Sequence, residues 1–267
     1  YGVTYFFNKR KLSEYAYKTA IKKSKGDYFV FFAADNELPN KNWISRMIYP
    51  FKDTKIIASY THIAVPKKTS LVNKYYSDLH VEPLSWFIYR ETSNPKYFSN
   101  YYEVLNKYKN NILFKFDKKN FPLIATAQGL VVRKSKFNFI NNLDGDDMLP
   151  VIKMIKNNKH LMYVSDAGIY HHHINNIMDY YNKYGERVRR TLLEENKGFF
   201  KREKLYSLKR KILLYLFMPY ALSIIFPAID SLILSIRSKN TYMLMHNIMV
   251  PILALSIFRQ FFKKYVI

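Results

Sequence analysis

Acidic and amide side chains directly after an apolar run are the first group that could carry out chemistry. Tyr28–Phe32 is too short for a helix and predicts a strand buried on both faces of a parallel sheet. Asp35, Asn36 and Glu37 follow it, at the place where ligands of open α/β sheets bind, beyond the carboxyl ends of the strands. Hard cations such as Mg²⁺ or Mn²⁺ take oxygen ligands and bridge them to phosphates, so this turn predicts a divalent cation bound through Asp35. The alternative is an acidic turn that caps the next helix, with Asn36 or Asn40 as the cap.

A second acidic group lies in the C-terminal half of the sequence. Asp144, Asp146 and Asp147 are close together, and carboxylates at this spacing require a cation, a basic neighbour or a raised pKa. Apolar residues at helical spacing follow them, so we expect the carboxylates at the N-terminus of a helix, where the helix dipole favours the ionised form. The alternative is a solvated first turn with no chemical role.

Three consecutive histidines, His171, His172 and His173, form the third group. Because successive residues of a strand point to opposite faces, the three cannot all ligate one metal ion. We therefore expect His172 and His173 to face an acceptor or solvent. The alternative for all three is a histidine run on the protein surface.

The stretch KGDYFVFFAADNELPNKNWI resembles the metal-binding strand of family-2 glycosyltransferases, in which an apolar strand ends in a DxD motif. Asp35 matches the second Asp of that motif, and Ala33 stands where the first is usual. The resemblance implies a GT-A fold of the α/β class: a Rossmann-like mixed, mostly parallel sheet flanked by helices. It also implies an earlier β-α-β portion with a base-contacting Asp, so we expect this sequence to be a fragment that lacks part of the donor pocket.

The second and third groups follow the order of the same family. Its members carry an acidic pair at a helix start, a basic residue in the second turn, and a strand that ends in Asp-Ala and Tyr-His. Here these are Asp146 with Asp147, then Lys153, Asp166 and His171. The resemblance implies that Asp147, next to Asp146, is the base that removes the acceptor proton in an inverting transfer. It also implies that His171 completes the Asp35 metal site, and that Mn²⁺ or Mg²⁺ neutralises the leaving nucleoside diphosphate.

Further residues are expected at the donor and acceptor sites. Gly129, in LIATAQGLVVRK, allows close backbone approach to a ligand, although a glycine needed only for a β-bulge is an equal alternative. The resemblance places Asn36 and Lys153 at the same sites, and Arg189 or Arg190 on the donor diphosphate. For these two arginines a solvated or lipid-facing basic helix is the alternative.

Around these groups the pattern predicts a series of strands and helices. We expect strands over 1–7, 56–60 and 123–133, and helices from Ser13, near 41–51, around 69–90 and 97–109, from Asp146, and over 180–211. The catalytic domain is expected over 1–195, and a basic linker with membrane-associated helices over 196–267.

The amino-acid composition limits the classes of binding partner that we expect. The net charge of +23 implies an anionic partner, and the absence of Cys excludes disulfides and thiolate metal sites. No motif resembles a DNA- or RNA-binding module, so nucleic acid is not expected. Ile212–Ile236 and Thr241–Phe258 are apolar and flanked by basic residues on all sides, which favours two in-plane or re-entrant helices on the cytoplasmic face of the cell membrane. A buried helical pair in a soluble protein is the alternative.

These patterns lead to one hypothesis and one rival. The hypothesis is a metal-dependent glycosyltransferase that moves a sugar from a nucleotide-sugar donor to a saccharide or lipid-linked acceptor at an anionic membrane surface. The rival is a non-catalytic, basic membrane-binding protein on a degenerate GT-A fold, which Ala33 favours.

Overall fold

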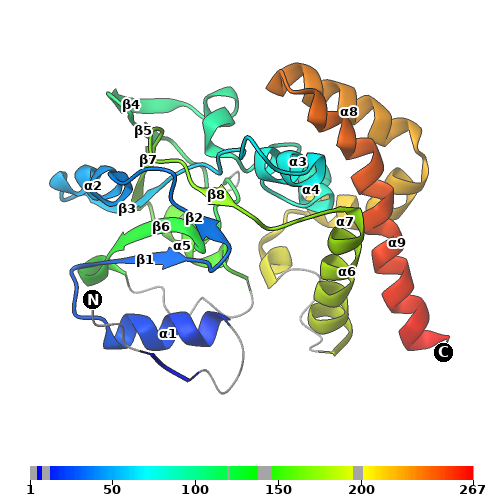
Figure 1. Ribbon diagram of the computed structural model, residues 1–267, viewed down its shortest axis with the longest axis horizontal. Coiled ribbons are helices and arrows are strands. Elements are labelled where there is room, and N and C mark those ends of the chain that lie inside the picture. The colour runs from blue at the N-terminus through cyan, green and yellow to red at the C-terminus, as the bar shows by residue number, and fades with distance from the viewer. Residues whose placement is uncertain (1–4, 8–12, 119–120, 138–145, 195–200, 267) are drawn as a thin grey trace. The chain divides into compact units, whose positions relative to one another are not determined.

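The computed structural model describes residues 5–7, 13–118, 121–137, 146–194 and 201–266. The chain forms two compact units (Figure 1). Unit 1 comprises Tyr1–His62 and Phe98–Ile169, and unit 2 comprises Ile63–Tyr97 and Tyr170–Ile267. The end of the catalytic domain near residue 195 stays a prediction.

Unit 1 contains a mixed sheet of six strands. In their order across the sheet they are β1 (Tyr28–Phe32), β6 (Gln128–Arg133), β3 (Ile56–Tyr60), β7 (His160–Val164), β5 (Asn111–Phe114) and β4 (Val104–Tyr108). β3 and β7 pair in parallel, and the other neighbours pair antiparallel. It follows that β1, β3, β7 and β4 run in one direction and β6 and β5 in the other. The predicted α/β fold, a mixed sheet with helices around it, is confirmed.

The strand β1 lies at the edge of the sheet. Phe29 and Phe31 are buried, whereas Val30 is 41% exposed, so the expectation of a strand buried on both faces is wrong. One face is covered by α1 (Ser13–Lys23), whose Tyr17 meets Phe31 edge to face with ring centroids 4.9 Å apart. The fully buried strand is β3, in the middle of the sheet.

Three predicted elements of unit 1 differ in the structure. The helix expected around 97–109 is wrong beyond Asn100, because β4 and β5 form a hairpin there, with Lys109 at φ 53° in the turn. Residues 5–7 are not in a strand, and residues 1–4 lie outside the described part. The strand expected over 123–133 is limited to β6.

The helix predicted near 41–51 consists of α2 (Trp43–Ile48) and a 3₁₀ turn, η1 (Tyr49–Lys52). The helix predicted at the acidic pair is α5, which begins at Leu149 and ends at Lys156.

Unit 2 is helical. Its helices are α3 (Leu71–Leu79), α4 (Pro83–Tyr89), α6 (Ile177–Val188), α7 (Leu208–Leu222), α8 (Ile225–Ser238) and α9 (His246–Tyr265), with 3₁₀ turns at Pro95–Asn100 (η2), Lys201–Leu205 (η6) and Thr241–Met245 (η7). The expected continuous helix over 180–211 is wrong in its described part. It changes to a π-helix, η5 (Arg189–Glu194), and Ser207 caps α7 by accepting a hydrogen bond from the amide of Arg210.

Two apolar helical segments lie in the C-terminal third. Among the described residues, Thr241–Tyr265 is long and apolar enough to cross a membrane. α7 and α8 meet the same test only if they count as one span, and they are bent by 100° at their junction. Ile224, at φ 58°, forms that break.

Candidate functional site

The turn after β1 is held by backbone and amide contacts. The amide nitrogen of Asn36 donates to the carbonyl of Ala33 at 3.1 Å, and its side-chain Nδ2 donates to the carbonyl of Ala127 at 2.8 Å. Ala33 itself donates to the same Ala127 carbonyl at 3.1 Å. The turn that carries Asp35 is therefore fixed to the chain before β6, and Asn36 fixes it. The Asn36 Oδ1 atom is buried and has no hydrogen-bond partner among the described residues.

His171 and His173 point to the same side of their strand segment. His171, at the end of the two-residue strand β8 (Tyr170–His171), is buried, His173 is half-buried and His172 is exposed. The rings of His171 and His173 have centroids 4.9 Å apart, and His173 stacks on Tyr76 at 5.0 Å. The alternation of faces along a strand places these two histidines together, so the expectation that His173 faces an acceptor or solvent together with His172 is wrong.

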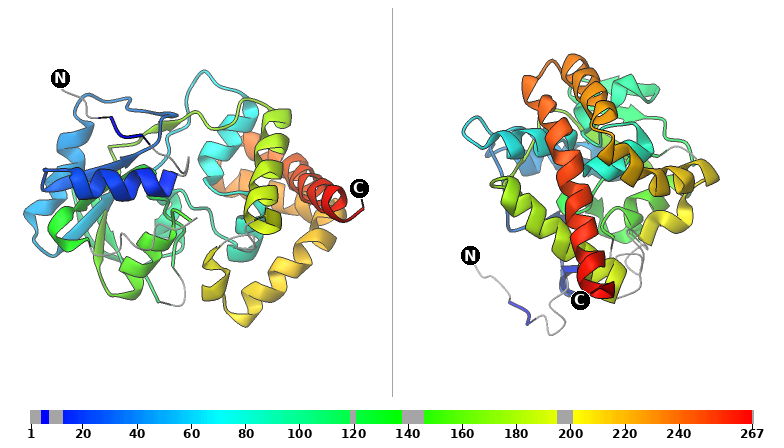
Figure 2. Two further views of the ribbon diagram at one scale, coloured as in Figure 1. Left: turned by 90° about the horizontal axis from the view of Figure 1, so that it is seen from below. Right: turned by 90° about the vertical axis from the view of Figure 1, so that its right-hand side faces the viewer.

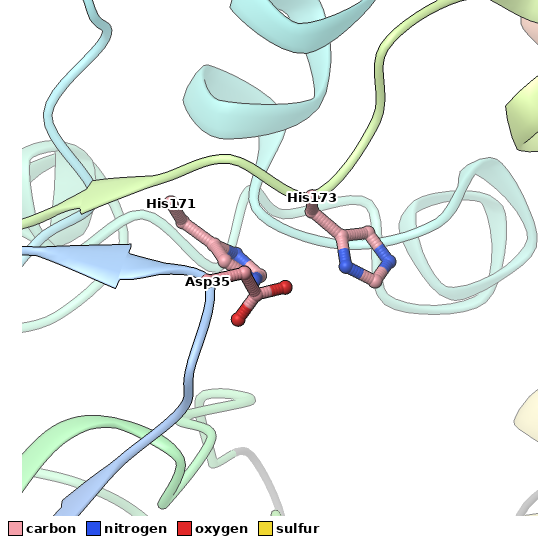
Figure 3. Close-up of side chains that lie close together, drawn as sticks. All are labelled: Asp35, His171 and His173. Carbon is pink, nitrogen blue, oxygen red and sulfur yellow. The ribbon is translucent and has the colours of Figure 1, made fainter.

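Asp35 and these two histidines could hold a metal ion. Figure 3 labels the three side chains; both histidines belong to unit 2 and Asp35 belongs to unit 1, so the role of Asp35 as a ligand beside them stays a prediction. One carboxylate oxygen and two imidazole nitrogens suit a divalent transition metal rather than Mg²⁺, which prefers oxygen ligands alone, so Mn²⁺ is the better fit of the two cations that the sequence predicts. The donor set therefore fits the cation that the sequence predicts, with His173 as an additional ligand.

The two residues of the acidic pair before α5, Asp146 and Asp147, differ in how far they are buried. Asp146 is 3% exposed, and its Oδ1 accepts a hydrogen bond from the amide of Met148 at 3.0 Å. Asp147 is half-buried, and its carbonyl accepts from the amide of Thr126 at 3.1 Å. The carboxylate of Asp146 thus shapes the turn into the helix, while that of Asp147 is the more accessible of the two. Asp144 lies outside the described residues.

Asp166 and Ala167 hold α2 against the sheet. Asp166 forms an ion pair with Arg46, with 3.4 Å between Oδ2 and Nε, and accepts a hydrogen bond from Asn110 Nδ2 at 3.0 Å. The carbonyl of Ala167 accepts from Trp43 Nε1 at 2.6 Å. The Asp-Ala pair of the sequence pattern therefore stabilises the position of α2 through its contacts with Arg46 and Trp43.

Trp43 also packs against Gly129. A Cβ atom at Gly129 would lie 3.0 Å from Cζ2 of the Trp43 ring, and the backbone there has φ +82°, a conformation that side chains rarely adopt. These two constraints are sufficient to explain why residue 129 is a glycine, and no ligand is needed for that explanation. A contact of Gly129 with the donor or acceptor stays a prediction.

The basic residues expected at the donor lie on two helical segments. Lys153 is half-buried on α5. Arg189 donates from Nε to Glu186 Oε2 at 2.8 Å, and this hydrogen bond lowers the pKa of the Glu186 carboxyl. Arg190 is exposed at the start of the π-helix. The roles of all three toward a donor stay predictions.

The chain was compared with known families and proteins. Residues 1–104 match the family model described as Glycosyl transferase family 2. The matched stretch includes β1, the Asp35 turn and β3, and it ends before Asp147 and His171. No curated protein matches the chain. The match covers residues 1–104 of the 267-residue chain and, with the mixed six-stranded sheet described above, supports similarity to family-2 glycosyltransferases.

Proposed function

We propose that the protein transfers a sugar from a nucleotide-sugar donor to an acceptor hydroxyl with inversion at the anomeric carbon. The observation that carries this proposal is the Asp35 turn, which lies inside the stretch that matches the family and carries one of the three side chains that could hold a metal ion. A divalent cation bound there would neutralise the charge that develops on the leaving nucleoside diphosphate.

The accessible carboxylate of Asp147 serves as the base. As the acceptor oxygen forms its bond to the anomeric carbon, the bond from that carbon to the diphosphate oxygen breaks, and the hydroxyl proton passes to the Asp147 carboxylate. Asp146 positions this residue through its hydrogen bond to Met148. Lys153, Arg189 and Arg190 supply positive charge for the diphosphate, and Asn36 positions the metal turn.

The metal site gives the first prediction. We expect Mn²⁺ to strengthen binding of a nucleoside diphosphate to the full chain at least about tenfold. The reason is that coordination of one phosphate by the cation contributes more binding free energy than a single charge-assisted hydrogen bond does. Asp35→Ala, His171→Ala and His173→Ala should each remove most of this gain. Titration calorimetry with a panel of nucleoside diphosphates, with Mn²⁺ or with EDTA, measures it.

His172→Ala is the matched control, because His172 is exposed beside the two ligating histidines. Binding that is the same in EDTA, or a loss in His172→Ala equal to that in His171→Ala, would contradict the metal site. Cation-independent binding would instead favour the second candidate, a non-catalytic membrane-binding protein, for which Ala33 in place of the first motif carboxylate is the specific observation.

We also propose that unit 2 associates with the cytoplasmic face of an anionic membrane. On α8 the polar Asp230 and Ser231 are buried, while Ile225 and Ile236 are 68% and 76% exposed. A helix that turns polar side chains inward and apolar ones outward suits a lipid environment. On α9 the buried His246 shows the same arrangement.

Contacts inside unit 2 explain why these polar groups point inward. The hydroxyl of Tyr75 lies 2.7 Å from His246 Nδ1, and the hydroxyl of Tyr220 lies 3.2 Å from Nε2 and donates to Asp230 at 2.8 Å. Arg90 pairs with Asp230 at 2.7 Å. Burial lowers the pKa of His246 to about 3, so the imidazole is neutral in this network. Lysines such as Lys239 and Lys263 remain at the surface to meet anionic headgroups.

Vesicle flotation gives the second prediction. The full chain should float with anionic vesicles at low salt and should still float, more weakly, at about 1 M salt. Salt screens the contribution of the lysines, whereas it does not screen the insertion of apolar side chains. The double variant Ile225→Glu with Ile236→Glu should still float with the vesicles at low salt, but high salt should release it. Ser238→Glu, at the end of the same helix, is the control. Complete release of the unmodified chain at high salt would contradict the insertion of α8.

A further inference from the structure

A groove runs between α6 and α9 in unit 2, and these helices lie side by side (Figure 2). The helices touch closely at Gly185, where a Cβ atom would lie 3.0 Å from Ser256 Oγ. Ser256 Oγ also donates to the carbonyl of Tyr181 at 2.7 Å. This contact fixes the spacing of the two helices, and next to it they leave a groove of ≈ 600 Å³.

The lining of the groove is apolar except for one guanidinium. Met178 on α6 is 63% exposed, and Leu255 and Phe258 on α9 are 54% and 58% exposed. Among the eight residues that line the groove, Arg259 is the one with a charge, and its guanidinium lies 5.4 Å from the centre of the Tyr181 ring. An apolar wall with a single cation is complementary to a molecule with a hydrocarbon chain and an anionic head.

The groove is continuous with the apolar surface of α9. Phe262, 43% exposed, also lines it, and Tyr265, 67% exposed, lies one turn further along the helix. A ligand that enters the groove from a bilayer therefore does not cross water.

The same groove begins close in sequence to the candidate metal ligands. Ile177, the first residue of α6 and part of the groove wall, is four residues after His173, since 177 − 173 = 4. Four residues of extended chain span at most about 14 Å. Arg259 contacts the Tyr181 ring, so a headgroup on Arg259 lies one helical turn further along α6 than Ile177.

We propose that the α6–α9 groove binds a long-chain lipid phosphate, with its phosphate on Arg259 and its hydrocarbon chain along Phe258 and Phe262 toward the apolar surface of α9. This lipid is the acceptor of the sugar, an assignment that rests on the proposed function. The net charge of +23 attracts anionic lipid to the surface in general. The groove adds selection, because it offers one cation at a fixed place beside an apolar channel.

Photocrosslinking of the full chain in lipid nanodiscs tests the groove. The probe is a long-chain alkyl phosphate with a photoreactive diazirine near its head, and the labelled peptides are identified by mass spectrometry. We expect labels within 174–183 and 252–262. Arg259→Gln should lower this labelling about tenfold, which corresponds to about 1.4 kcal/mol. Arg259→Lys should retain most of it.

Two controls define the contribution of the phosphate. Arg237→Gln removes an exposed arginine on α8, outside the groove, and should leave the labelling unchanged. An alkyl alcohol probe of the same chain length should label more weakly and should not respond to Arg259→Gln. Labels spread evenly over α7, α8 and α9, or phosphate labelling that Arg259→Gln does not change, would overturn the proposal.

The groove and the enzymatic function can fail separately. Metal-dependent nucleotide binding without groove labelling would overturn the lipid site and leave the transferase proposal in place. Groove labelling that depends on Arg259, without any nucleotide binding, would support the lipid site and overturn its assignment as the sugar acceptor.

Discussion

Asp147→Asn should lower sugar transfer by at least about 100-fold while a nucleoside diphosphate binds with nearly unchanged affinity. An amide of the same shape cannot take the acceptor proton, and the loss of a positioned base costs 10²-fold to 10⁴-fold. The hydrogen bond from Thr126 to the carbonyl of Asp147 uses the main chain, so the substitution keeps it. Transfer from a labelled donor to a membrane extract, measured with the full-length protein, gives the rate.

Asp53→Asn is the matched control, because Asp53 is an exposed carboxylate of unit 1 with no predicted role. Asp146→Asn separates the two members of the acidic pair. Its amide oxygen can still accept the hydrogen bond from Met148, so we expect a smaller loss than in Asp147→Asn. Activity of Asp147→Asn within a factor of two of the unmodified enzyme would exclude this residue as the base.

The sequence predicts the positions of the site residues better than their individual roles. The alternation of faces along a strand, with a buried His171, is sufficient to place His173 beside it. The same rule that excludes three histidine ligands on one metal ion therefore selects these two. The function of Asp146 could not be predicted in this way. Its carboxylate bonds to an amide two residues along the chain, and only the turn geometry distinguishes that cap from a second reactive group.

The fold follows from the sequence where periodicity is strong and departs from it where tertiary contacts decide. The centre of the sheet, β3, and the helix before β1 lie where they are predicted. The β4–β5 hairpin is not predicted, because its strand residues Val104–Tyr108 are exposed and carry no alternating apolar pattern. The apolar run of β1 indicates burial on two faces, but position at the sheet edge cannot be read from a single strand.

Residues 63–97 show the same limit on a larger scale. Helices are expected in this region from its sequence, but not their place in the same compact unit as the C-terminal helices. Long-range polar contacts around Asp78, on α3, join them to the chain near residue 240. No local pattern in the sequence indicates this pairing.

Asp78 is completely buried and accepts hydrogen bonds from several partners. The hydroxyl of Tyr97 lies 3.0 Å from both carboxylate oxygens, and Oδ2 also accepts from the hydroxyl of Tyr242 and from Asn240 Nδ2, each at 2.9 Å. Lys96 forms an ion pair with Oδ1. Burial and the negative charge of Asp78 raise the pKa of the Tyr97 and Tyr242 hydroxyls, so both remain protonated and donate.

Asp78→Ala should therefore lower the free energy of unfolding by about 3 to 5 kcal/mol, because it leaves three hydrogen-bond donors and the partly exposed ammonium of Lys96 without their acceptor. Thermal unfolding of the full chain in detergent, checked by urea titration, measures the loss. Asp53→Ala, at an exposed carboxylate, should change stability by less than about 0.5 kcal/mol. Asp78→Asn keeps an acceptor oxygen but loses the charge opposite Lys96, so its cost should fall between the two. A loss below about 1 kcal/mol in Asp78→Ala would mean that water replaces the carboxylate, and that these contacts do not hold residues 63–97 to the C-terminal helices.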